Sequence, residues 1–255
     1  RFRAAILERK HNMQKLLSHV RRCVEDFDMF TDGDSVAVGV SGGKDSLTVL
    51  CTLARLAKFY PKKFEVKAIS LDLGYDEMDF SPIAALCDQL EVPYRVIHTD
   101  IKTVVFDIRK EENPCSLCAN MRRGALNNAA KEWGCNKVAL GHHLDDAVET
   151  FLLSLIYEGR LSCFAPVTYL DRSGIYAVRP LLYCREYEIK SFVQRAALPV
   201  VKNACPADQN SKRKRVKELA GVLKEERADI YEKIFGAMQR LPLEGWETKN
   251  SPFQK

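Results

Sequence analysis

The 255-residue sequence contains no run of eighteen apolar residues, which excludes a membrane-spanning helix of ordinary length. Its opening segment, RFRAAILERKHN, is too charged to be a secretory signal peptide. Internal repeats and low-complexity tracts are also absent from the sequence. Hydrophobic residues make up 46% of the chain, which is ample for a buried core. We therefore expect a globular, cytoplasmic protein without a membrane partner.

The sequence carries neither an extreme charge nor a disulfide framework. Its net charge is +5, which permits a polyanionic partner without requiring one. Nine cysteines are scattered along the chain without a secretion signal, so we expect reduced thiols. Cys51, Cys87 and Cys184 lie in apolar stretches and are expected to be buried as small hydrophobic residues.

Strand and helix patterns alternate along the chain, and this order predicts a doubly wound, mostly parallel α/β sheet of the Rossmann-like type. We expect an N-terminal helical segment over residues 1–30, an α/β domain over residues 31–200 and a basic helical extension over residues 201–255. The expected strands cover residues 36–40, 64–73, 94–98, 138–141, 167–170 and 175–178. The expected helices after the first segment begin near residues 44, 81, 118, 146, 186 and 212. Ser81 is expected to cap its helix, with Pro82 in the first turn.

The stretch VAVGVSGGKDS, residues 36–46, joins an apolar strand to a helix through a glycine pair. Such a loop directs several backbone N–H groups and the positive end of the helix dipole at one point, which suits phosphate. The Walker pattern fails because three residues separate Gly39 from Gly43 and Asp45 follows the lysine. The dinucleotide fingerprint G-x-G-x-x-G fails as well. The alternative interpretation is a glycine-serine turn without a ligand.

Two further loops are expected to meet this one. In a parallel sheet the ligand lies beyond the carboxyl ends of the strands, and residues 72–74 and 141–146 follow two other predicted strands. Asp145 and Asp146 open a helix there and can hold Mg²⁺ against phosphate oxygens. Asp145 can also simply cap that helix. The adjacent histidine pair points to two sides, so either one histidine lies near a nucleotide or both are structural.

The second motif is a C-x-x-C formed by Cys115 and Cys118 after a proline. Two such thiolates can bind one metal ion or cluster, or they can form a redox disulfide. A second C-x-x-C is missing, which argues against a zinc ribbon with four cysteine ligands. Cys205 is the best third ligand because it lies in a polar loop before a proline, and Cys135 and Cys163 compete with it.

The segment SGGKDS resembles the PP-loop of the ATP pyrophosphatase superfamily, whose members split ATP into AMP and pyrophosphate to adenylate a substrate. SGGKDS, the C-x-x-C, GHHLDD and a late cysteine in ACP follow one another in that order. With this set, residues 10–225 resemble the TtcA family of tRNA 2-thiocytidine synthetases. The resemblance implies a PP-loop domain of the HUP type that binds ATP through Gly39, Val40, Ser41, Gly42, Gly43, Lys44, Asp45, Ser46, Leu71, Leu73 and Gly141.

The same resemblance implies the metal groups. Cys115, Cys118 and Cys205 would hold a 4Fe–4S cluster in which one iron has no protein ligand and stays open for sulfur. Asp145 and Asp146 would hold Mg²⁺ beside the ATP phosphates.

The implied reaction begins when ATP adenylates the C2 oxygen of a cytidine, at position 32 of the anticodon loop. Sulfur carried by the cluster then replaces that oxygen, and AMP leaves. The implied catalytic residues are Lys44, Asp45, Arg122, Asp145 and Asp146. Lys44 would balance developing charge, and Arg122 would either stabilise the adenylated intermediate or be an ordinary surface arginine.

The implied partner is tRNA. The basic run over residues 212–215 can follow its phosphates or form an ordinary solvated helix face. We also expect a sulfur donor such as a cysteine desulfurase, and a homodimer is possible in principle. The alternatives are a PP-loop thiolation enzyme acting on uridine or a small molecule, and a non-enzymatic nucleotide-binding protein whose C-x-x-C senses redox state or binds zinc.

Overall fold

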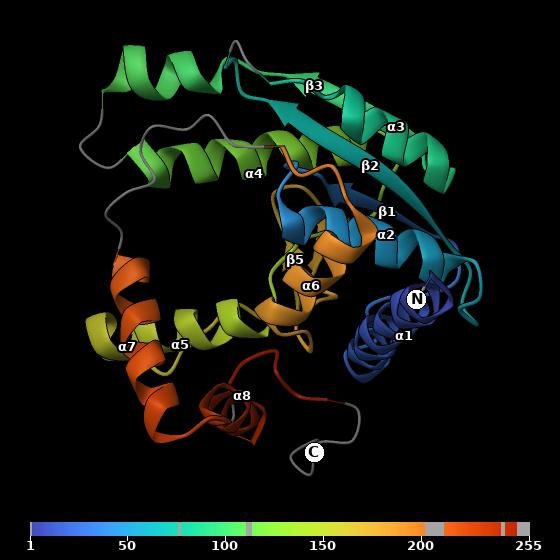
Figure 1. Cartoon of the computed structure of the whole chain (residues 1–255). Helices are drawn as coiled ribbons and strands as arrows, with labels where there is room; N and C mark the ends of the chain where they lie inside the picture. The colour runs from blue at the N-terminus through green and yellow to red at the C-terminus, as the bar shows by residue number, and fades with distance from the viewer. Residues whose placement is uncertain (1, 76–77, 111–113, 202–211, 241–242, 249–255) are drawn as a thin grey trace.

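The computed structural model describes residues 2–75, 78–110, 114–201, 212–240 and 243–248, with side chains from residue 13 onward. Its strands are β1 (Asp34–Gly39), β2 (Phe64–Asp72), β3 (Tyr94–His98), β4 (Lys137–Ala139), β5 (Val167–Leu170) and β6 (Ile175–Val178). They form one sheet in the order β3-β2-β1-β4-β6-β5 (Figure 1). All neighbours are parallel except β5, which runs antiparallel to β6 at one edge. The predicted doubly wound, mostly parallel α/β fold is confirmed.

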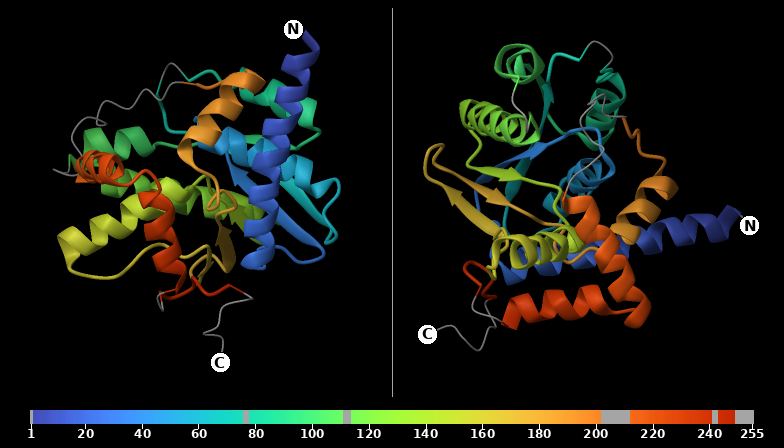
Figure 2. Two further views of the ribbon diagram at one scale, coloured as in Figure 1. Left: turned by 60° about the horizontal axis from the view of Figure 1, so that its bottom comes forward. Right: turned by 90° about the vertical axis from the view of Figure 1, so that its left-hand side faces the viewer.

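Helices surround this sheet and extend from it. They are α1 (Phe2–Asp26), α2 (Lys44–Ala57), α3 (Ser81–Leu90), the π-helix η1 (Thr103–Arg109), α4 (Pro114–Glu132), α5 (Leu144–Glu158), α6 (Glu186–Ala196), α7 (Lys212–Glu226) and α8 (Ile230–Arg240). The late helices α7 and α8 both contact α5, and α1 contacts α6 and α2. Figure 2 shows α7 and α8 lying next to α5 in both views.

Strand β1 explains how the core divides between the two faces of the sheet. Successive side chains of a strand point to opposite faces. Val36 and Val38 accordingly belong to the large core cluster that includes Leu47 and Leu50 of α2. Ala37 belongs to a second cluster, which includes residues of α4 such as Leu126. Helices α2 and α4 therefore cover opposite faces of the central strand.

Several element boundaries differ from the sequence predictions. The predicted cap Ser81 is the first residue of α3, and the preceding Asp79 accepts hydrogen bonds from its backbone N and its hydroxyl, at 2.8 and 2.9 Å. Helix α4 begins at Pro114, four residues earlier than predicted, because proline suits a first helical position. The C-x-x-C therefore lies within the helix. The π-helix η1 was not predicted.

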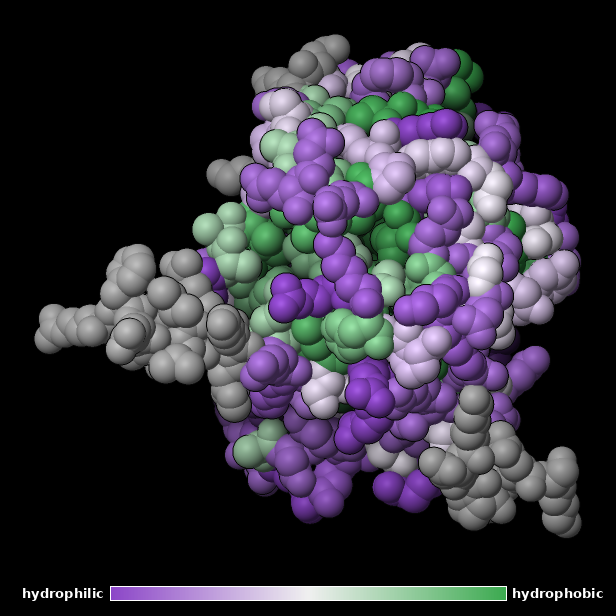
Figure 3. Space-filling model, turned by 90° about the vertical axis from the view of Figure 1, so that its right-hand side faces the viewer, coloured by the Kyte–Doolittle hydropathy of each residue, from purple (hydrophilic) through white to green (hydrophobic). Residues whose placement is uncertain are grey.

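The surface and the cysteines follow the sequence expectations. Cys51, Cys87 and Cys184 are each no more than 5% exposed and belong to the main core cluster. The face in Figure 3 has hydrophobic residues gathered near its middle and hydrophilic residues around them. None of the described helices combines the length and the apolar character that a membrane crossing requires.

Trp246 anchors the segment after α8, and its truncation should be strongly destabilising. Its side chain is 1% exposed, and its ring lies edge-on to Phe27 at 6.3 Å and to Phe235 at 5.3 Å between centroids. We predict that Trp246→Ala lowers the free energy of unfolding by about 3–5 kcal/mol. Denaturant titration measures this change. Phe59→Ala, at a side chain that is half exposed, is the control and should change stability little.

Candidate active site

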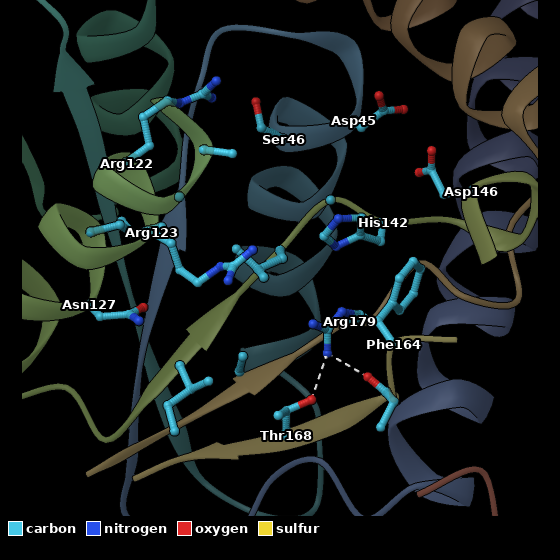
Figure 4. A pocket seen from close by; sticks show the side chains of 18 of the residues that line it. Asp45, Ser46, Arg122, Arg123, Asn127, His142, Asp146, Phe164, Thr168 and Arg179 are labelled. Atoms are coloured by element: carbon cyan, nitrogen blue, oxygen red, sulfur yellow. Dashed lines mark hydrogen bonds between the residues drawn. The ribbon is translucent and has the colours of Figure 1, made fainter. Parts of the chain in front are cut away.

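A cavity of about 1220 Å³ opens beyond the carboxyl ends of β1, β2 and β4 (Figure 4). Predicted site residues that line it are Gly39, Val40, Ser41, Asp45, Ser46, Leu71, Leu73, Arg122, Gly141 and Asp146. Predicted site residues that do not line it are Gly42, Gly43, Lys44, Cys115, Cys118 and Asp145. Cys205 lies outside the described residues. The three loops predicted to converge therefore do so, as the strand-end rule requires.

The glycine loop after β1 is tied together by two serines. The hydroxyl of Ser46 accepts from the backbone N of Ser41 at 3.2 Å and donates to the carbonyl of Gly43 at 2.9 Å. Gly42 has a φ of +80°, and a Cβ there would lie 2.9 Å from the Cβ of Val201. Helix α2 starts directly after Gly43, which offers no side-chain cap. The first N–H groups of the helix are thus left to bind an anion.

Gly141 brings the end of β4 into contact with this loop. A Cβ at this position would lie 3.1 Å from the backbone carbon of Asp45 and 3.2 Å from the backbone N of Ser46. Any larger residue would push the two loops apart. The close approach places the residues after β4, beginning with His142, beside the first turn of α2.

Lys44 does not line the cavity, and its side chain pairs with two carboxylates. Its Nζ lies 2.8 Å from Oδ2 of Asp45 and 3.3 Å from Oε1 of Glu186. Burial alone would lower the pKa of this lysine, but the two carboxylates outweigh it and raise the pKa. The other oxygen of Asp45, Oδ1, is buried and makes no hydrogen bond within the described chain. A carboxylate oxygen left in this state beside a phosphate-binding loop suits a cation.

Asp145 and Asp146 occupy different environments. Asp145 is buried, accepts from Nε of Arg185 at 3.2 Å and from Nη2 at 3.1 Å, and also accepts the backbone N–H of Glu186 at 2.8 Å. Its oxygens are therefore occupied by protein donors. Asp146 lines the cavity, and its Oδ1 lies 3.2 Å from Nη2 of Arg213. Of the predicted magnesium pair, only Asp146 lines the cavity, and its two oxygens contact Arg213 and the backbone N–H of His143.

The alternative role for Asp145, as the cap of α5, is wrong. The cap residue is His143, whose Nδ1 accepts the backbone N–H of Asp146 at 3.3 Å. Asp146 in turn accepts the backbone N–H of His143 at 3.1 Å, which completes a capping box. Among the described residues, no three His, Cys, Asp or Glu side chains gather as a metal site. Magnesium would therefore need phosphate and water ligands in addition to Asp45 and Asp146.

The C-x-x-C lies at the start of the helix that forms one wall of the cavity. Cys115 is exposed and Cys118 is half-buried, three residues apart on one side of α4. From Ala119 onward the same helix lines the cavity, and Figure 4 shows Arg122 opposite Ser46. A helix N-terminus favours thiolates, so this pair has the donor chemistry of a metal or cluster site.

The two competing cysteines are less suited to metal binding. Cys135 is 4% exposed and accepts from the hydroxyl of Ser35 at 3.5 Å. Cys163 lines the cavity, but burial raises the pKa of its thiol to about 12 and its Sγ donates to the carbonyl of Ala147 at 3.4 Å. A buried thiol stays protonated and is a poor ligand.

Sequence reasoning missed several charged residues that the fold brings to the site. Arg179 follows β6 and lines the cavity, and Arg123 and Arg213 also line it. Arg185 binds Asp145 from a distance of forty residues along the chain. The rule applied to the ends of β1, β2 and β4 also covers the end of β6, so Arg179 could have been predicted. No local signal pointed to Arg185.

Glu149, on the buried side of α5, should make stability depend on pH. It is 4% exposed, and burial raises its pKa to about 7 although Lys217 and Arg213 act in the opposite direction. Because the folded pKa exceeds the ordinary 4.5, this residue destabilises the fold as pH rises from about 4.5 to 7. We predict that Glu149→Gln gains stability at pH 8, on the order of 3 kcal/mol, and gains little at pH 4.5.

Thermal and denaturant unfolding of both proteins at the two pH values measure this difference. Glu225→Gln, at an exposed position of α7, is the matched control and should show no pH-dependent gain. Equal stability of Glu149→Gln and the unmodified protein at pH 8 would contradict the assignment.

Comparison with protein families and curated proteins identifies relatives over most of the chain. Residues 10–223 match the family model of the PP-loop domain. The tRNA-cytidine(32) 2-sulfurtransferase of Teredinibacter turnerae is 36% identical over 237 residues, which cover 92% of this chain and 78% of that protein. The protein of the same name from Shewanella frigidimarina is 35% identical over 251 residues, covering 97% of this chain and 80% of that protein.

A solved structure of another tRNA-modifying enzyme has a similar fold. The U34-tRNA thiolase NcsA from Methanococcus maripaludis, solved with its [4Fe-4S] cluster, superposes with a TM-score of 0.76 at 24% identity, covering 91% of this chain and 79% of that one. This likeness shows a shared fold. The matched domain and the curated relatives confirm the resemblance drawn from SGGKDS and the cysteines. The chain belongs to the PP-loop family and, within it, to the family of the tRNA-cytidine(32) 2-sulfurtransferases.

Proposed function

We propose that this protein is an ATP-dependent tRNA sulfurtransferase that replaces the C2 oxygen of a cytidine, at position 32 of the anticodon loop, with sulfur. One observation carries the proposal beyond family membership: a single helix, α4, begins with Cys115 and Cys118 and then lines the cavity at the phosphate loop. The sulfur-handling residues and the ATP-handling residues are thus joined by one rigid element.

The phosphate loop supports the adenylation step. The N–H groups at the start of α2 and the hydroxyls of Ser41 and Ser46 would hold the phosphates of ATP. The C2 oxygen of the base would attack the α-phosphorus, and pyrophosphate would leave with the electrons of the broken P–O bond. Arg122, which faces Ser46 across the cavity, would offset the charge that develops on the α-phosphoryl oxygens. The adenylated oxygen is then a good leaving group.

Asp45 and Asp146 are the residues we propose for Mg²⁺, which would offset the charge of the phosphates when bound. Oδ1 of Asp45, which makes no hydrogen bond within the described residues and lies 3.7 Å from Nε2 of His143, fits this role. Asp145 would act by holding Arg185 rather than by binding metal directly. Lys44 would reach the phosphates by exchanging its contact with Asp45 for a phosphoryl oxygen.

Cys115, Cys118 and Cys205 are the proposed ligands of a [4Fe–4S] cluster. A cluster held by three cysteines leaves one iron open, which can carry a sulfur atom. Cys115 and Cys118 fit because they are close in sequence on one helix turn and reach the surface beside the cavity wall. NcsA, which shares the fold, was solved with a [4Fe-4S] cluster. Sulfide attack at C2 of the adenylated base would then break the C2–O bond and release AMP. A cysteine desulfurase would supply the sulfur as a persulfide, which a two-electron reductant would bring to the level of sulfide.

The basic start of α7 supports tRNA as the substrate. Arg213 lines the cavity while Lys212 and Lys214 are exposed on the same helix turn. A polyanion bound along this turn would be held at the edge of the cavity, with an affinity that falls as salt concentration rises. A tRNA base must leave its stack to enter the cavity, and a loop nucleotide does so at low cost. A homodimer remains a prediction.

An anaerobic reaction tests the proposal. The protein, reconstituted with iron and sulfide, is incubated with unmodified tRNA, ATP, Mg²⁺ and sulfide. We expect AMP and 2-thiocytidine to form in equal amounts. Formation of 2-thiouridine would contradict the proposal and support the alternative of a thiolation enzyme that acts on uridine. Formation of ADP without any thiolated nucleoside would also contradict the proposal.

A further inference from the structure

Arg179 is a buried cation that has no carboxylate partner among the residues that the structure describes. It follows β6, is 9% exposed and lines the cavity. Its Nη1 donates to the carbonyl of Ala165 and to the hydroxyl of Thr168, the latter at 3.1 Å. No ion pair links it to an acidic side chain in the described part of the chain. Burying an unpaired charge is costly, so a ligand that accepts hydrogen bonds is the expected partner.

The guanidinium has hydrogen-bonding capacity to spare. An arginine side chain carries five N–H donors, and Nη1 uses two of them here. Nε makes no hydrogen bond within the described residues although it is buried. The face of the guanidinium lies 4.9 Å from the ring centroid of Phe164, which fixes its plane. Burial also lowers the pKa of Arg179 to about 10, as expected where no anion compensates the charge.

Apolar and charged side chains share the cavity with Arg179. The apolar ones include Leu126, Leu140, Val167 and Ala177. Arg123 lines the cavity as well, and its charge helps to lower the pKa of Arg179. His142 also contacts Phe164, with 4.7 Å between the centroids of the two rings (Figure 4). Burial, followed by the charge of Arg179, lowers the pKa of His142 to about 4, so its imidazole is neutral near pH 7.

The lining around Arg179 suits one of the two ligands of the proposed reaction, the tRNA base, better than the other, ATP. A phosphate finds its backbone donors at the loop between β1 and α2, whereas Arg179 is flanked by Phe164 and shares its cavity with apolar side chains. A nucleobase has apolar faces and a polar edge, and so matches apolar and aromatic walls with a buried donor whose Nε is unused within the described residues. The close approach of Gly141 to Asp45 places the next residue, His142, beside the loop proposed to hold the phosphates.

We propose that Arg179 and His142 form the subsite that holds the target base, with the guanidinium donating to the O2 and N3 acceptors of a cytosine. The inference rests on the proposed tRNA thiolation and adds the residues that hold the acceptor. Thr168 is a positioning residue, because its hydroxyl accepts a hydrogen bond from Nη1 and so orients the guanidinium. Arg122 and the loop serve the nucleotide instead.

The test compares two anticodon stem-loop RNAs, one with cytidine at the target position and one with an abasic site there. We expect the protein to bind the cytidine RNA about 10–100-fold more tightly, since a hydrogen bond to a charged group contributes on that scale. In Arg179→Met this preference should vanish, while affinity for a non-hydrolysable ATP analogue stays unchanged. A preference that survives in Arg179→Met would overturn the inference, as would an equal loss of ATP-analogue binding.

Two further measurements keep the outcome unambiguous. Thr168→Val keeps the guanidinium of Arg179. It should weaken the cytidine preference several-fold and raise KM for tRNA, with kcat little changed. An unaltered preference and KM would overturn the inference even if Arg179→Met fails to fold. Thiolation by the unmodified protein is measured in parallel. Failure of that protein to thiolate any tRNA would refute the proposed function itself, whereas thiolation with full cytidine preference in Arg179→Met refutes only this subsite.

Discussion

Replacing Cys115 with alanine should remove iron and tRNA thiolation together while leaving ATP binding intact. Cys115 is exposed at the start of α4, so its loss creates no cavity in the core and the fold should persist. It is one of three thiolates proposed to hold the cluster, and losing a ligand should lower thiolation at least about 100-fold. Iron and acid-labile sulfide content, visible absorbance and ATP binding are measured on anaerobically purified protein.

Cys163→Ala is the matched control for this prediction. Cys163 lines the same cavity, but its buried thiol has a pKa near 12 and donates a hydrogen bond to a carbonyl. Its replacement should leave iron content and absorbance unchanged. The unmodified protein should be brown, with broad visible absorbance that Cys115→Ala lacks. A colourless unmodified protein containing one zinc ion would refute the cluster and favour the alternative of a zinc-binding sensor.

Gly42→Ala should weaken ATP binding by about 10–100-fold. The φ of +80° at this position is strained for any residue with a Cβ, and the added carbon would lie 2.9 Å from Val201. Either the loop or the chain at Val201 must shift, and the N–H groups that face the cavity shift with the loop. The strained conformation costs about 1–3 kcal/mol with alanine, and the bound state must restore it, so this cost appears as the loss of affinity for ATP. Calorimetric titration with an ATP analogue measures it.

Gly221→Ala on α7 provides the comparison. Nothing lies within 4 Å of a Cβ at that position, and alanine should stabilise the helix by up to about 1 kcal/mol. ATP affinity should be unchanged in this variant. ATP binding by Gly42→Ala as tight as that of the unmodified protein would show that the loop geometry is not required for nucleotide binding.

Much of the fold could be predicted because the signals are local. Alternating Val36 and Val38 mark a strand whose two faces are both covered, and the glycine pair marks its end. The rule that ligands bind beyond the carboxyl ends of parallel strands then gathered Ser46, Leu73 and Gly141 in one place, and all three line the cavity. None of these inferences depended on knowing which distant side chains meet.

Sequence reasoning was incomplete where distant side chains decide the outcome. Asp145 and Asp146 are neighbours in sequence, yet Arg185 binds the first and leaves the second to the cavity. Lys44 turns to Glu186 for the same reason. Helix propensity alone did not show that Cys115 lies inside a helix. The place of Cys205, outside the described residues, stays a prediction.

The account as a whole depends on the identity of the modified nucleoside. Nucleoside mass spectrometry is applied to tRNA from cells that lack this protein, and to the same cells supplied with the unmodified protein or with Cys115→Ala. We predict that 2-thiocytidine is missing without the protein, returns with the unmodified chain and stays missing with Cys115→Ala. An unchanged level of 2-thiocytidine in cells lacking the protein would contradict the proposed function.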